Sequence, residues 1–166
     1  MKNLKKSTIV LIVATVICLG LSIFSANASV TRTNNAIKNL GEITYSEESK
    51  EKLDKAVSYY NALDDNLGLK DKITNMEEFE AAKVRYASLA IKAASVADSR
   101  KEAEGYANSD VAEFVKAARE VVDAYLTADQ YSLVENYADL TELEAEYTSE
   151  GGAGTTDTEE VVVPMC

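Results

Sequence analysis

Histidine and tryptophan are absent from this chain of 166 residues, and proline occurs only once, at Pro164. Without histidine, the chain lacks the commonest general base and the commonest ligand of transition metals. Ser-His-Asp and Cys-His catalytic sets are therefore excluded. The sequence also contains no glycine-rich phosphate loop and no dinucleotide-binding motif. We expect a protein that is not an enzyme and that uses neither a metal nor an organic cofactor.

Cysteine is almost as scarce, with only Cys18 and Cys166 in the chain. Because Cys18 lies in the apolar N-terminal stretch described below, a single thiol remains for the body of the protein. One thiol cannot form a disulfide within the fold, so stability has to come from packing. Cys166 is either the site of an intermolecular disulfide or an unused residue of the tail.

Acidic residues are missing from the start of the chain, where none precedes Glu42, although Lys2, Lys5 and Lys6 are basic. The whole chain has 17 basic and 28 acidic side chains, and residues 29–166 keep 14 and 28, a net charge of −14. Such a body repels phosphate backbones. We therefore expect no binding to nucleic acid.

The three lysines stand before an apolar stretch, residues 7–25, which is followed by Ala26-Asn27-Ala28. A basic head, an apolar core and small residues at the end are typical of a signal peptide. Residues 1–28 are predicted to be this signal, cleaved after Ala28, and the protein is expected to be secreted or held at the cell surface. The alternative is an uncleaved anchor, whose membrane contact would be made through residues 7–25.

Low glycine and proline content favours helices in the body of the chain, which is rich in Ala, Glu, Lys and Leu. Apolar residues recur every three or four positions in three segments. These positions are Leu53, Ala56, Val57, Tyr60 and Leu63; Phe79, Ala82, Tyr86, Leu89, Ala93 and Val96; and Val111, Phe114, Val115, Ala118, Val121, Val122 and Tyr125. The pattern predicts an all-α fold, a small antiparallel helical bundle over residues 29–148, followed by a flexible acidic tail at 149–166.

Helix ends can be placed from single residues. Ser46, Asn75 and Asn136 precede predicted helices and are expected to act as N-terminal caps. Asn108 or Ser109 is expected to do the same before Val111. Gly68 and Gly105 suit the left-handed turn that ends a helix.

The body contains two segments of similar sequence, at about residues 46–104 and 108–148. In both halves an asparagine, Asn75 or Asn136, is followed by a large apolar residue four positions later and a tyrosine eleven positions later. The tyrosines are Tyr86 and Tyr147. Either the bundle is built from two related helical repeats, or two amphipathic stretches match by coincidence.

Three segments give this chain a family resemblance: Ala36–Ser46, Ala56–Leu63 and Val134–Tyr147. They resemble the helical repeat modules, including the FIVAR-type repeats, of large surface proteins of Gram-positive bacteria. The resemblance implies small helical bundles that serve as stalks or as adhesion and ligand-binding modules. Residues 35 to about 148 are covered by it.

Candidate contact residues are few. Tyr59, Tyr106 and Tyr131 fall off the apolar stripes and are either interface anchors or boundary residues. Asp64–Gly68 hints at a calcium loop, but Asn75 stands where the twelfth, acidic ligand belongs, so a helix end is the other interpretation. We expect an exported, non-catalytic interaction or adhesion module that contacts an unidentified protein or cell-surface ligand. A membrane-anchored spacer without a ligand is the main alternative, and a small extracytoplasmic enzyme or cation binder is a further one.

Overall fold

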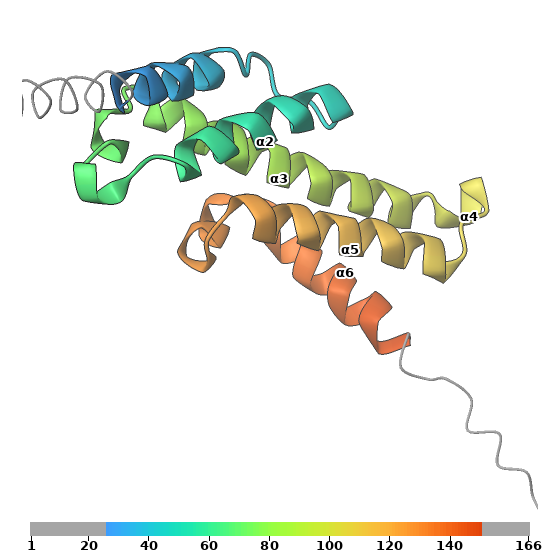
Figure 1. The fold of residues 1–166 in the computed structure, drawn as a ribbon. Helices are drawn as coiled ribbons and strands as arrows, with labels where there is room; N and C mark the ends of the chain where they lie inside the picture. Colours follow the sequence, from blue (N-terminus) through green and yellow to red (C-terminus); the bar gives the residue numbers. More distant parts are fainter. Residues whose placement is uncertain (1–25, 151–166) are drawn as a thin grey trace, which may run out of the picture. The chain divides into compact units, whose positions relative to one another are not determined.

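The computed structural model describes residues 26–150, and the side chains as far as Tyr147. The predicted signal, except for residues 26–28, and Cys166 lie outside the described residues. The described part is all-α, as predicted, and no strand occurs in it. A helix that covers residues 26–38, here called the N-terminal helix, comes first. The elements that follow are α2 (Glu47–Asn61), η1 (Asp65–Leu67), η2 (Lys70–Lys72), α3 (Met76–Ser99), α4 (Lys101–Glu104), α5 (Asn108–Tyr125), η3 (Ala128–Leu133) and α6 (Tyr137–Glu150) (Figure 1).

The chain divides into two compact units, and the division falls inside α3, between Tyr86 and Ala87. The first unit contains the N-terminal helix, α2 and the beginning of α3. The second contains the rest of α3 and the elements from α4 to α6. The similarity of the two sequence segments predicted that the two halves of the bundle meet near Gly105. The division lies elsewhere because no glycine or proline interrupts α3, so one helix supplies residues to both units.

The first unit buries one stripe from each of its three helices. The N-terminal helix and the turn after it bury Ile37, Leu40 and Ile43, and α2 buries Leu53 and Ala56; Leu63, Leu69, Ile73, Phe79, Ala82 and Tyr86 complete the core. The α2 stripe follows the predicted spacing, although Val57 and Tyr60 are only half-buried. Removal of these apolar surfaces from water is the main force that folds the unit.

The second unit has a core of the same kind. The rest of α3 buries Ala87, Ala90, Ile91, Ala94 and Ala97, α5 buries Val111, Val115, Ala118, Val122 and Tyr125, and Leu126, Val134, Leu140, Leu143 and Tyr147 close it. Helix α6 packs along α5. The predicted position of Phe114 in the core was wrong, since 40% of this residue is exposed.

The predicted seam of α3 holds only in its first half. Phe79, Ala82 and Tyr86 are buried, but Leu89 and Ala93 are half-buried and Val96 is 38% exposed. In the second half the buried residues stand one position later, at Ala90, Ala94 and Ala97. One residue corresponds to about 100° around a helix. The buried face therefore differs between the two halves, because each half packs in a different unit.

Several predicted helix ends are confirmed. The Ser46 hydroxyl accepts a hydrogen bond from the backbone N–H of Ser49 at the start of α2. Gly68 ends η1 with φ of 59°, and Gly105 ends α4 with φ of 74°. The cap predicted at Asn108 or Ser109 was wrong. Both residues lie inside α5, whose cap is Ala107, because the Asp110 carboxylate accepts from the Ala107 N–H at 2.9 Å.

Asn75 and Asn136 stand directly before α3 and α6, but their side chains do not cap these helices as predicted. A capping side chain accepts through its oxygen, and in both residues Oδ1 is buried without a hydrogen-bond partner. Each amide donates instead to the backbone of the first helix of its unit. Asn75 Nδ2 lies 3.2 Å from the carbonyl oxygen of Asn34, and Asn136 Nδ2 lies 3.0 Å from that of Ser88.

We expect Asn75→Ala and Asn136→Ala each to lower the free energy of unfolding by about 1–2 kcal/mol, since each removes a hydrogen bond between two segments of one unit. Urea denaturation followed by circular dichroism measures this loss. Asn61→Ala is the control, because Asn61 is exposed at the end of α2. A loss at Asn75 or Asn136 no larger than that of the control would contradict the linking role.

Candidate functional site

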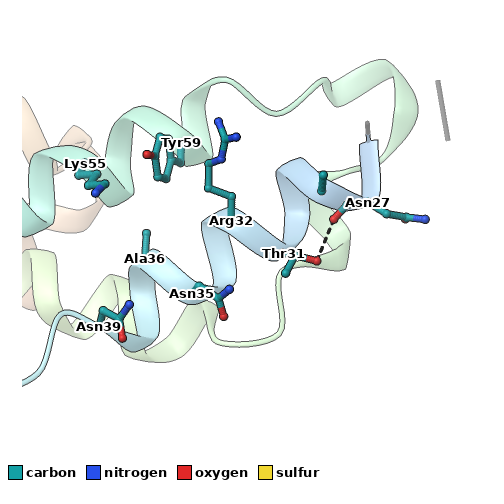
Figure 2. Close-up of a pocket in the computed structure, with 9 residues that line it drawn as sticks. Asn27, Thr31, Arg32, Asn35, Ala36, Asn39, Lys55 and Tyr59 are labelled. Carbon is teal, nitrogen blue, oxygen red and sulfur yellow. Dashed lines mark hydrogen bonds between the residues drawn. The ribbon is translucent and has the colours of Figure 1, made fainter. Parts of the chain in front are cut away.

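A pocket of about 610 Å³ lies in the first unit between the N-terminal helix and α2 (Figure 2). The N-terminal helix lines it with two rows of side chains spaced four residues apart, and α2 contributes Lys55 and Tyr59. Side chains at this spacing lie above one another on one helix face. The first row is Ala28, Arg32 and Ala36, and the second is Asn27, Thr31, Asn35 and Asn39. The small alanines leave open space on both sides of Arg32.

Two positive charges surround the Tyr59 ring in this pocket. The guanidinium carbon of Arg32 lies 5.5 Å from the ring centroid, and Lys55 Nζ lies 6.0 Å from it. Figure 2 shows Arg32 reaching from the N-terminal helix toward α2. The electron-rich face of an aromatic ring attracts cations at this distance. Among the described residues, neither cation has a carboxylate oxygen within 4 Å, so the pocket holds two positive charges without an ion-pair partner.

The second row supplies polar groups that face solvent. Asn35 and Asn39 are exposed, and within residues 26–150 no hydrogen bond is formed by their side-chain amides. Thr31 Oγ1 donates to the carbonyl oxygen of Asn27 at 2.9 Å. Each free amide offers one acceptor and two donor hydrogens. The pocket therefore combines cations with amides, a set of groups that binds anionic and hydrogen-bonding ligands.

A second cluster of cations and rings lies in the second unit, where Arg119 of α5 is fully engaged. Its Nε and Nη2 atoms each lie 2.5 Å from a carboxylate oxygen of Glu144, and Nη1 donates to the Tyr137 hydroxyl at 3.1 Å. The hydrogen bonds to Glu144, with a further contribution from Tyr137, raise the pKa of Arg119 above its ordinary value. The arginine stays charged, and the bidentate pair joins α5 to α6. This cluster has a structural role.

The end of α6 is held by a third polar cluster. The Tyr147 hydroxyl donates to the Asp98 carboxylate and accepts from Lys101 Nζ at 2.8 Å. Burial and the hydrogen bond to Asp98 raise the pKa of Tyr147. Burial likewise raises the pKa of Tyr86, the corresponding tyrosine of the first unit. Both hydroxyls are therefore neutral at physiological pH and act in packing.

The three candidate contact tyrosines, Tyr59, Tyr106 and Tyr131, are all half-buried, and of the three only Tyr59 lies in the pocket. The Tyr106 ring lies 6.0 Å from that of Phe114. Tyr131 stacks on Tyr137 at 4.9 Å, and its hydroxyl donates to Asp123 at 2.8 Å. Neighbouring side chains cover part of each ring, which stripe position alone does not predict. Tyr106 precedes α5 and Tyr131 follows it, so the two do not form one surface patch.

The hinted calcium loop behaves as a helix end. The Asp64 carboxylate accepts from the Asn66 N–H at 2.8 Å, which caps η1, and Asp65 pairs with Lys70 at 2.9 Å. Over the part of the chain that the structure describes, no group of three or more Cys, Asp or Glu side chains is placed to hold a metal ion.

Comparison with known proteins gives no relative: no family model matches the chain, and no curated protein or solved structure matches it either. Within the described helices, none is both long enough and apolar enough to cross a bilayer.

Tyr59 was predicted from the sequence as a candidate contact residue, whereas Arg32, Lys55 and the row of amides were not. Their signal is present in the chain, since Asn27, Thr31, Asn35 and Asn39 are spaced by four residues. That spacing places polar side chains along one helix face. Apolar periodicity does not reveal this row, because its residues are polar. The contribution of α2 depends on tertiary packing, which no local pattern predicts.

Proposed function

We propose that this protein is an exported, non-catalytic interaction module and that the pocket of its first unit is the contact site. The observation that carries the proposal is the pair of cations, Arg32 and Lys55, around the Tyr59 ring. Of the fourteen lysines and arginines in residues 26–150, seven form an ion pair with a carboxylate. Among those that do not, Arg32 and Lys55 are the two that line the pocket. Two cations that face a pocket without such a partner suit an external anionic group.

The charge of the two units differs in a way that supports this assignment. Residues 26–86 contain nine basic and eleven acidic side chains, whereas residues 87–150 contain five and fourteen. The net charges are −2 and −9. An anionic ligand is repelled much less by the first unit, while the acidic second unit favours solubility.

Export is supported by the basic head and the apolar stretch at residues 7–25. Cleavage after Ala28 would remove two lining residues, Asn27 and Ala28, and leave Arg32, Lys55 and Tyr59 in place. Mass spectrometry of the protein from the culture medium or cell surface is expected to show a chain that starts at Ser29. A start at Met1 would favour the alternative, a spacer held in the membrane by residues 7–25.

We further propose that the two units are copies of one ancestral helical repeat, in agreement with the resemblance to the surface repeat modules. Corresponding residues, 61 positions apart, have corresponding environments. Asn75 and Asn136 both donate to a backbone carbonyl within their unit. Tyr86 and Tyr147 are both buried. In this arrangement α3 is the last helix of the first copy and the first helix of the second.

The interaction role predicts that charge reversal in the pocket abolishes capture of the ligand. Full-length chain, purified in mild detergent and immobilised, is incubated with a cell-surface protein extract in saturating amounts. The double variant R32E/K55E is expected to lose the captured material. The matched control, K72E/K92E, changes the net charge equally at two exposed lysines that do not line the pocket.

Equal capture by both double variants would contradict the assignment of the site. No saturable capture by any form would favour the spacer.

A further inference from the structure

The row of polar side chains on the N-terminal helix has a spacing that matches an extended peptide. Thr31, Asn35 and Asn39 are each four residues apart, which is about 6 Å along a helix axis. Two residues of an extended chain span about 6.6–6.8 Å. A peptide that lies along the helix therefore presents an equivalent backbone group to each successive turn. An asparagine amide can bind both the N–H and the C=O of such a backbone.

The cations of the pocket specify the side chains of the ligand. Arg32 and Lys55 both lie over the Tyr59 ring, so the ring is engaged by the protein itself and is less available to stack on a sugar. The guanidinium of Arg32 can bind a carboxylate with two parallel hydrogen bonds. Carboxylates on alternate residues of an extended peptide point to one side of the chain, which is the side that faces the cations.

We propose that the pocket binds an extended acidic segment of a partner protein, with its backbone along Thr31, Asn35 and Asn39 and its carboxylates at Arg32 and Lys55. This inference rests on the proposed function, since it names the ligand class of the same site. The volume of about 610 Å³ lies in the usual range of ligand pockets. Most of the lining residues are exposed, so the pocket is open to solvent and accessible to a segment of a longer chain. Asn27 is not required, and cleavage after Ala28 would not remove the site.

Fluorescence anisotropy with the full-length chain in mild detergent tests the inference. The probe is a fluorescein-labelled octapeptide of alternating glutamate and serine. Its comparators are the alternating lysine and serine octapeptide and a labelled uronic-acid tetrasaccharide. We expect saturable binding of the glutamate peptide. Binding is expected to weaken at least about tenfold in R32Q/K55Q, which loses charge-assisted hydrogen bonds, and about fivefold or more in N35A/N39A, which loses the backbone contacts.

The control variant K72Q/K92Q removes the same number of positive charges as R32Q/K55Q, but away from the pocket. It should change binding by less than about twofold. Loss in R32Q/K55Q without loss in N35A/N39A would overturn backbone recognition, because simple charge attraction does not need the amides. Tighter binding of the tetrasaccharide than of the glutamate peptide would replace the peptide with a glycan and leave the interaction site in place. If no probe binds but R32E/K55E still loses capture from the extract, the ligand class is wrong and the proposed function stands. Unchanged capture by R32E/K55E would contradict both the proposed function and the proposed ligand class.

Discussion

Replacement of Phe79 by alanine is expected to lower the free energy of unfolding by about 3–5 kcal/mol. Phe79 is 1% exposed, and its ring lies 5.5 Å from that of Tyr60. The substitution removes the apolar surface of the ring and leaves a cavity that the small first unit cannot fill completely. Because domains of this size are stable by only about 5–15 kcal/mol, much of the stability would be lost. Urea denaturation followed by circular dichroism at 222 nm measures the change.

Leu67→Ala is the matched control for the loss of apolar side-chain atoms. Leu67 is 61% exposed in η1, and its truncation is expected to change the stability by no more than about 0.5 kcal/mol. A loss below about 1 kcal/mol at Phe79 would mean that this ring does not belong to the core of the unit.

Ala87→Pro is expected to cost about 3 kcal/mol or more and to lower the helix content. Proline removes a backbone donor from the middle of α3 and clashes with the preceding turn. Buried residues lie on both sides of the substitution, with Tyr86 in the first unit and Ala90 and Ile91 in the second. A single break therefore weakens both cores. The melting temperature and the amplitude of the helical signal measure the effect.

Glu47→Pro is the matched control, because it introduces the same residue at a position where proline is compatible with the helix. Glu47 is the first residue of α2, and Ser46 before it has an extended backbone with φ of −143° and ψ of 157°. Proline is favoured at this position, so the variant is expected to stay close to the stability of the unchanged chain. If Ala87→Pro is tolerated as well as Glu47→Pro, α3 is not a continuous helix shared by the two units.

The helices could be predicted from the sequence because their signals are local. Leu53, Ala56 and Leu63 repeat at helical spacing, and Gly105 and Ser46 mark ends through their own backbone or hydroxyl chemistry. The second half of α3 was predicted less well. Its alanines at 87, 90 and 94 are a weaker signal than Leu89 and Val96, although the alanines are the residues that are buried. Which side of an alanine-rich helix is covered depends on the neighbouring helices, and the sequence of the helix does not contain that information.

Side-chain partners were predicted least well. Asn75 and Asn136 were identified by their position before a helix, but their amides donate across the unit to Asn34 and Ser88, which precede them by 41 and 48 residues. The pocket could not be predicted for the same reason. Arg32 and Tyr59 come from different helices and meet only after the first unit has folded.

Hydrogen exchange measured by mass spectrometry, with and without the captured partner, tests the central claim most directly. The full-length chain in detergent is compared in the two states, and the K72E/K92E variant serves as a control for the charge of the chain. Interaction through the pocket predicts slower exchange in the N-terminal helix, residues 26–38, and in α2, with no change in α5 and α6. Protection confined to α5 and α6, or no protection anywhere while the partner is bound, would contradict the proposal that this protein acts through the pocket of its first unit.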